Sequence, residues 1–314
     1  MSVTISPKLR LWAPYAVLSL LSLLWGTSFL FIKIASRTFD PVSLALGRVG
    51  VAAAALAVAA LAMGLRWPRR PALGLRPAAL PLVGQMLPAG ALARAGRLTT
   101  SADMALMMGA IPIFVFVVAR FAPPTERWRL RPALGLLLGL LGVAVALSGS
   151  LAMGKPTSAD GWGGDALALL AALGYAAGSL MSRPVAREIG VTMTVAASML
   201  ASTLMLALAW LVTQALAPGR SFEPAPFDGL VAVVALGLFN TALAYLVYFR
   251  LIQTAGATFA GLNNYLVPPL GLLAGAVVLG EPLQIAAFPG LALILCGALM
   301  TGPARRGESA AASS

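Results

Sequence analysis

Histidine is absent from this 314-residue chain, and acidic residues are few, with 10 Asp and Glu against 22 Lys and Arg. Without imidazole, histidine metal sites and histidine acid–base catalysis are excluded. The single cysteine, Cys296, excludes an intrachain disulfide and a thiolate metal cluster. Only 10% of the residues are charged and 60% are hydrophobic, so no segment is polar enough to form a soluble domain. We therefore expect a polytopic membrane protein without a metal or cofactor.

Long apolar runs alternate with short connections along the whole chain, and each run has about the 20 residues that a membrane-spanning helix needs. The first run is too long for the core of a cleavable signal peptide, so we interpret it as the first span. The expected spans are Trp12–Ile34, Val42–Met63, Pro77–Ala93, Thr99–Phe121, Pro132–Leu151, Gly163–Met181, Thr192–Leu216, Gly229–Phe249, Ala255–Leu279 and Leu283–Met300.

The basic residues lie in the connections between runs, not on one wet surface, so the net charge of +12 does not indicate a nucleic-acid partner. If the N-terminus is cytoplasmic, most of these residues fall in cytoplasmic loops, in agreement with the positive-inside rule. Examples are Arg66, Arg69, Arg70, Arg127, Arg129 and Arg131. Both termini are then cytoplasmic, and residues 304–314 form a disordered tail.

Polar and aromatic residues recur in the same order in the two halves of the chain, 150 to 156 residues apart. The equivalent pairs are Trp25 and Tyr175, Lys33 and Arg183, Gln85 and Asn240, Pro112 and Pro268, and Glu126 and Glu281. Each half has five spans, an odd number, so the second half must be inverted in the membrane. The expected fold is therefore ten transmembrane helices in two inverted five-helix repeats, residues 1–153 and 154–303, with a substrate site between them near the midplane.

At this point the sequence resembles the drug/metabolite transporter superfamily, specifically its ten-helix EamA-type members, over nearly its whole length. The motifs are WGTSF (Trp25–Phe29) with Lys33 following, Asp40-Pro41 leading to Arg48, TTSA (Thr99–Ala102), TAGA (Thr254–Ala257), the two mid-span prolines and LGEPL (Leu279–Leu283). The first half departs from the family pattern in its third span, which contains Pro81 and Pro88 and lacks the aromatic residues of the eighth. It departs again at residues 123–127, where PPTER replaces a GER-like corner.

The resemblance implies a secondary transporter of a bacterial inner membrane that moves small metabolites, amino acids or drugs, often outward. Alternating access around a central cavity is the leading hypothesis, in a monomer or homodimer. A non-transporting membrane sensor or assembly subunit is the alternative. An enzyme is not expected, because the spans contain no nucleophile with a base, no carboxylate pair and no metal-binding set.

Arg48 lies inside the second span, where a charge costs about 2.5–3.5 kcal/mol at the helix centre. It must therefore face protein or water. Two interpretations remain open. Arg48 pairs with Asp40 or with helix-end carbonyls near the membrane edge, or it contacts an anionic or carboxylate-bearing substrate.

Amide side chains are the next candidates, because each can both donate and accept hydrogen bonds to a substrate. They are Gln85, Asn240, Asn263 and Asn264. Hydrogen bonding between helices is the alternative, at about 0.6–2 kcal/mol each. Asn263 and Asn264 are adjacent on a helix, so one is expected to face the cavity and the other a neighbouring helix.

Aromatic residues with polar tips are candidates for an amphipathic cavity wall, although membrane-interface belts also use them. These candidates are Trp25, Tyr175, Tyr245 and Tyr265. Ser28 of the WGTSF motif and Met108 complete the set. Met108, with Met104 and Met107, forms either an adaptable surface or ordinary packing.

Carboxylates are scarce in the spans, and the first span has none. Asp103 is the one acid expected inside a helix, where it either complements the helix dipole or couples protons. Glu281, before Pro282, is expected to cap the last helix. The first span thus lacks the acid that a cation-extruding small multidrug transporter would need, so the expected substrate is neutral, zwitterionic or anionic.

Overall fold

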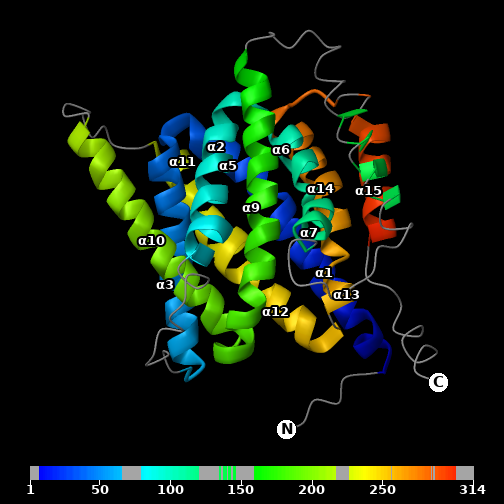
Figure 1. The fold of residues 1–314 in the computed structure, drawn as a ribbon, viewed down its shortest axis with the longest axis horizontal. Coiled ribbons are helices and arrows are strands. Elements are labelled where there is room, and N and C mark those ends of the chain that lie inside the picture. The colour runs from blue at the N-terminus through cyan, green and yellow to red at the C-terminus, as the bar shows by residue number, and fades with distance from the viewer. Residues whose placement is uncertain are drawn as a thin grey trace.

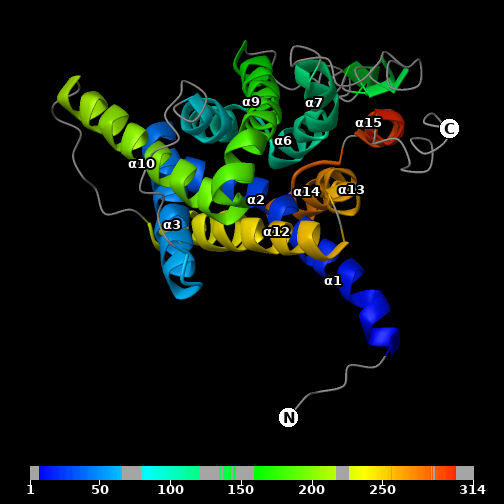
Figure 2. The same ribbon diagram turned by 60° about the horizontal axis from the view of Figure 1, so that its bottom comes forward.

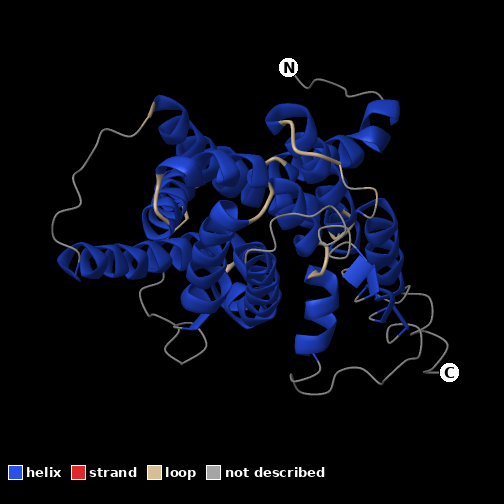
Figure 3. Cartoon of the chain, turned by 90° about the horizontal axis from the view of Figure 1, so that it is seen from above, coloured by secondary structure: helices blue, strands red, loops and turns tan. Residues whose placement is uncertain are grey.

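The structure, a computed structural model, describes residues 7–65, 79–119, 134–135, 137–139, 141–142, 144–145, 159–216, 226–255, 257–283, 285 and 287–301. These residues form helices and connections, with no strand among them (Figure 3). Six of the described helical segments are long and apolar enough to cross a membrane, and Asn263–Leu279 and Ala287–Gly297 are shorter apolar helices. The expected all-α membrane fold is confirmed.

Four of the expected spans in the first half have described helices (Figure 1). They are α1 (Pro7–Gly26) with α2 (Ser28–Thr38), α3 (Pro41–Ala62), the π-helix η1 (Leu82–Met86) with α5 (Leu87–Leu98), and α6 (Ser101–Met108) with α7 (Ile111–Ala119). The third span therefore continues to Leu98, beyond its expected end at Ala93. As a result, Arg94 and Arg97, expected in a loop, lie in the last turns of α5. Most of the expected fifth span lies outside the described residues.

All five expected spans of the second half have described helices. They are α9 (Ala159–Ile189), α10 (Val191–Leu216), α11 (Phe227–Gly237) with the π-helix η2 (Leu238–Leu243) and α12 (Ala244–Ala255), α13 (Ala257–Ala260) with α14 (Asn263–Leu279), and α15 (Ala287–Thr301). The sixth span is longer than expected at both ends, and the tenth begins four residues later than expected, at Ala287 and not Leu283.

Several helix ends are fixed by short polar residues or glycine. Asp40 caps α3, because its Oδ1 accepts hydrogen bonds from the backbone N–H groups of Val42 at 3.0 Å and Ser43 at 3.1 Å. Thr100 caps α6 by accepting from the N–H of Asp103 at 3.0 Å. Gly280 ends α14 with φ of 64°, the left-handed conformation that glycine adopts without a side-chain clash. The sequence thus specifies where these helices start and stop.

Helix pairs in one half have counterparts in the other. The second and seventh spans, α3 and α10, pack together, as do the fourth and ninth, through α6 and α14. The third span packs on the sixth through α5 and α9. The eighth span packs on the first, with α11 against α2 (Figure 1) and α12 against α1 (Figure 2). Such pairing is expected of two repeats related by a pseudo-two-fold axis.

The two π-helices are a further sign of the repeat. They begin 156 residues apart, at Leu82 and Leu238, in the third and eighth spans, and contain the equivalent residues Gln85 and Asn240. A π-helix adds a residue to the turn and is frequent at functional sites. Both halves of the chain therefore contain a helix interruption at the equivalent place, with an amide side chain within it.

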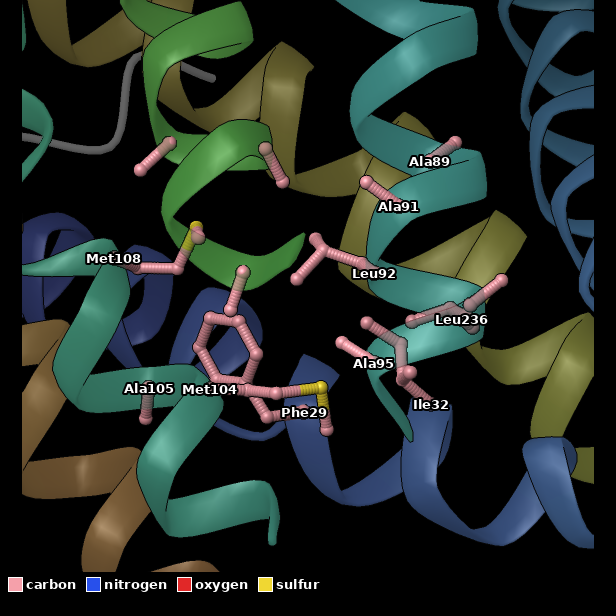
Figure 4. Close-up of a cluster of buried hydrophobic side chains, with 14 of the residues drawn as sticks. Phe29, Ile32, Ala89, Ala91, Leu92, Ala95, Met104, Ala105, Met108 and Leu236 are labelled. Atoms are coloured by element: carbon pink, nitrogen blue, oxygen red, sulfur yellow. The ribbon is translucent and has the colours of Figure 1, made fainter. Parts of the chain in front are cut away.

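The interior between the helices is packed with small and medium apolar side chains. In Figure 4, α2 (Phe29, Ile32), α5 (Leu92, Ala95) and α6 (Met104) direct side chains toward one another. The outward faces are also apolar. On α10, for example, Leu204, Leu208 and Leu216 are 63–80% exposed, as expected for contact with lipid and not with water.

Candidate functional site

Four rings from two spans form one aromatic cluster, which consists of Trp25 at the end of α1 and Tyr245, Tyr248 and Phe249 on α12. The centroid of Trp25 lies 5.9 Å from that of Tyr245, edge to face, and 5.3 Å from that of Tyr248. Phe249 lies 5.9 Å from Tyr245 and 5.7 Å from Tyr248. The rings are partly buried, except for the buried Phe249, and together they combine apolar faces with the polar tips of two tyrosines and a tryptophan.

Gln85 connects the aromatic cluster to the first half of the chain. Its Nε2 donates to the hydroxyl oxygen of Tyr245 at 3.4 Å, so the π-helix η1 meets α12 here. Tyr175 of α9 lies near enough to Tyr245 to interact with it electrostatically. Trp25, Gln85 and Tyr175 therefore all lie close to Tyr245.

The close approach of η1 to α9 depends on two glycines. A Cβ added at Gly84 would lie 2.9 Å from the Cα of Gly178, which real side chains do not tolerate. Gly84 precedes Gln85, and Gly178 follows Tyr175 by one turn. These glycines therefore bring both polar side chains to the same region of the interior.

Asn240 bonds to the interruption between α1 and α2. Its Nδ2 donates to the hydroxyl oxygen of Thr27 at 3.0 Å and to the carbonyl of Leu24, while its Oδ1 is buried without a partner. Only 1% of Asn240 is exposed. The side chain thus bridges two helices, and one acceptor atom remains for a ligand.

Arg48 of α3 bonds to Thr241, the residue after Asn240. The guanidinium Nε donates to the Thr241 hydroxyl at 3.2 Å, whereas Nη1 is buried without a partner. Asp40 instead caps α3 and accepts from the Ser43 hydroxyl at 2.6 Å. The Arg48–Asp40 pair, one of the interpretations left open above, is therefore not formed, because the carboxylate serves the helix end.

Asn263 lies at the start of α14, after the turn that separates it from α13. Its Oδ1 accepts from the Ser22 hydroxyl of α1 at 3.0 Å, and its Nδ2 is buried without a partner. Asn264 and Tyr265 are half-buried beside it. Asn263 is thus the member of the asparagine pair that bonds a neighbouring helix. Its partner, Ser22, lies one turn before Trp25 on α1.

Ser28 and Met108 have more local environments. The Ser28 hydroxyl donates to the carbonyl of Trp25 at 2.6 Å, within the same interruption of the first span. Met108 is 5% exposed and belongs to the apolar core with Met104 (Figure 4). Met107 is part of the same core. The methionines pack as core residues, the second of the two interpretations above.

A polar network lies at the predicted outer end of the helices, away from these residues along the spans. The Thr99 hydroxyl lies 2.6 Å from Oδ1 of Asp165 and 3.1 Å from Oδ2 of Asp103, and Lys33 donates to the carbonyl of Thr99 at 2.6 Å. Asp165 is 4% exposed and lies within α9, which begins at Ala159. The expectation that Asp103 is the one acid inside a helix is therefore wrong, because α9 begins earlier than its apolar run.

Glu281 also belongs to this outer network. Its carboxylate accepts from the backbone N–H groups of Ser101 at 3.0 Å and Ala102 at 3.1 Å, and from the Ser101 hydroxyl at 2.7 Å. Glu281 thus caps α6, not the last helix, which begins only at Ala287. An acid of the second repeat stabilises the positive end of a helix in the first.

Sequence reasoning missed Thr241 and Thr27 as partners of Arg48 and Asn240. The available signal was position in the sequence, since Thr241 follows Asn240 and Thr27 lies two residues after Trp25. However, a threonine in a span more often bonds its own helix. Six of the predicted candidates are joined through contacts to Tyr245, to Thr241 or to the interruption of the first span. They are Trp25, Arg48, Gln85, Tyr175, Asn240 and Tyr245.

The fold and these contacts define a repeat-built helical membrane protein whose polar side chains meet between the halves, at places where helices are interrupted. The EamA-like transporter family matches residues 12–148 and again residues 162–302, so the chain belongs to that family and is built from two copies of its domain. It is a membrane transporter, not an enzyme.

Relatives cover most of the chain at low identity. An uncharacterized inner membrane transporter, YedA of Escherichia coli K12, is 26% identical over 86% of this chain and 84% of YedA. A probable terminal-alkyne amino-acid exporter of Streptantibioticus cattleyicolor is 27% identical over 88% of this chain and 89% of the exporter. A crystal structure that is 22% identical has a TM-score of 0.65 and covers 92% of this chain and 97% of its own, which supports the fold.

Proposed function

We propose that this protein exports a small neutral, zwitterionic or anionic solute across a bacterial inner membrane by alternating access, as a monomer or homodimer with both termini in the cytoplasm. The observation that carries the proposal is the meeting of Trp25, Gln85 and Tyr245, because Gln85 comes from the first repeat and Tyr245 from the second. A substrate held by both repeats changes exposure when one rocks against the other.

The interrupted helices support this motion. The first span is divided into α1 and α2 between Gly26 and Ser28, and the third and eighth spans contain the π-helices η1 and η2. Such irregular turns are tolerated in a membrane where they are buried in protein or line a wet path. Candidate substrate contacts therefore lie where the backbone can adjust without exposing its polar groups to lipid.

Amino acids are the first solutes to test, since a relative is described as a probable amino-acid exporter. The scarcity of acids in the first span also argues against permanent cations as substrates. We propose export as the direction because that same relative is described as an exporter. The similarity to YedA, an inner membrane transporter, supports placement in an inner membrane.

The test is counterflow in proteoliposomes loaded with a panel of amino acids and related small metabolites. We expect at least one solute to be exchanged faster than in protein-free liposomes, and Tyr245→Ala to abolish that exchange. Leu208→Ala on the exposed face of α10 is the control and should exchange as wild type does. Exchange by Tyr245→Ala at the wild-type rate would remove the aromatic cluster from the substrate path, and selective transport of a quaternary ammonium ion would contradict the proposed charge.

A further inference from the structure

Arg48 is a buried cation with no carboxylate partner among the residues that the structure describes. It is 9% exposed and is the one lysine or arginine in the buried class among the described residues. Its neighbours Leu44, Ala45 and Val49 on α3 are buried and apolar. Because an isolated charge in such surroundings is costly, the protein needs a compensating group close to it.

The described residues supply only part of that compensation. Nε donates to the Thr241 hydroxyl at 3.2 Å, which is a neutral partner, and Nη1 has none. The nearest acid along the chain, Asp40, uses Oδ1 for two backbone N–H groups and Oδ2 for the Ser43 hydroxyl. The guanidinium is held in position by Thr241, but no carboxylate within the described part of the chain balances its charge.

The unmatched charge lies beside the aromatic cluster. Thr241 and Tyr245 are four residues apart on the eighth span and therefore share a face. Arg48 also lies near enough to Tyr245 for its charge to act on the phenol. A group bound at Nη1 would thus lie toward the face of the eighth span that carries Thr241 and Tyr245.

We propose that Arg48 binds a carboxylate of the transported solute, while the aromatic cluster packs against its apolar part. This rests on the proposed function and narrows it from neutral, zwitterionic or anionic solutes to those with a carboxylate. One guanidinium balances one negative charge, and the planar fork of arginine matches the geometry of a carboxylate. Thr241 is then a positioning residue that orients the guanidinium.

The binding test uses purified protein in detergent and thermal unfolding, at constant ionic strength. The probes are carboxylate and amide pairs that differ in one group: leucine and leucinamide, phenylalanine and phenylalaninamide, phenylacetate and phenylacetamide. We expect at least one carboxylate to bind wild type about tenfold or more tightly than its amide, since a hydrogen bond to a charged group contributes that much. Arg48→Gln should lose this preference, and Arg48→Lys should keep part of it.

The matched control is Arg94→Gln, because Arg94 lies in α5 with its side chain exposed. It should keep the wild-type preference. Equal binding of every carboxylate and its amide by wild type would overturn the proposal, as would an unchanged preference in Arg48→Gln. Failure of the proposed function is a separate result: carboxylates would bind through Arg48, but proteoliposomes would exchange none of them.

Discussion

Replacing Glu281 should destabilise the packing of the two repeats, because this residue caps a helix in the other half. Its carboxylate accepts three hydrogen bonds, from the N–H groups of Ser101 and Ala102 and from the Ser101 hydroxyl, at 2.7–3.1 Å. The residue is half-buried, so water can partly replace these bonds. The loss of a helix cap lowers the free energy of unfolding by about 0.5–2 kcal/mol, and the loss of a negative charge at a helix N-terminus lowers it by about 0.3–1 kcal/mol.

For Glu281→Gln, which keeps one acceptor oxygen but loses the charge, we expect a loss of about 1 kcal/mol in unfolding free energy. Glu281→Ala removes all three acceptor contacts and should lose about 2 kcal/mol. The measurement is unfolding of the purified protein by titration of mixed micelles with a denaturing detergent. Glu188→Gln, an exposed acid near the end of α9, is the control and should change stability by less than about 0.5 kcal/mol.

A double-mutant cycle then tests the contact itself. Ser101→Ala removes the hydroxyl that donates to Glu281, so its effect should shrink by about 0.5 kcal/mol or more when Glu281 is already alanine. The reasoning is refuted if Glu281→Ala is as stable as Glu188→Gln. Strict additivity with Ser101→Ala would refute the inter-repeat bond while leaving the backbone cap in place.

Three other substitutions test local features of the fold and the site by the same unfolding measurement. Asp40→Ala should lose about 0.5–2 kcal/mol, because it removes the cap of α3, and an unchanged stability would show that water replaces it. Gly178→Ala should lose about 1–3 kcal/mol, because its Cβ would meet the backbone of Gly84, whereas Gly90→Ala, with open space around it, should lose nothing. Asn240→Leu should lose about 0.6–2 kcal/mol through its bond to Thr27 and should also slow exchange, so wild-type exchange at equal expression would exclude it from the site.

The spans and the repeat were predictable because both depend on properties that run along the chain. An apolar run of about twenty residues has few structures available to it in a membrane, and the helix is one that satisfies every backbone group. The equivalence of Gln85 and Asn240 was visible as a spacing, and the structure places each in a π-helix. The π-helices themselves had no sequence signal, since neither η1 nor η2 contains proline or an unusual composition.

Helix ends were less predictable where a polar residue bonds far along the chain. Glu281 followed by Pro282 has the local pattern of a helix start, yet its carboxylate reaches α6, 180 residues earlier in sequence. Asp165 lies two residues after the expected start of the sixth span at Gly163, but α9 starts at Ala159 and the side chain is buried against Thr99. Local propensity cannot reveal a partner that only tertiary packing supplies.

The interruption of the first span shows why polar residues gather where they do. In a continuous helix inside lipid, each carbonyl already accepts from the N–H four positions on, so it offers a foreign amide only its second lone pair. At Thr27 the helix changes, and both the Leu24 carbonyl and the Thr27 hydroxyl accept from Asn240, while Ser28 bonds back to the carbonyl of Trp25. Trp25, which lies on the same interruption, is thereby held against the rings of α12. Because one buried amide of the eighth span bonds the interruption that carries Trp25, we expect a movement of that span that breaks the Asn240 bonds also to shift Trp25 relative to the aromatic cluster.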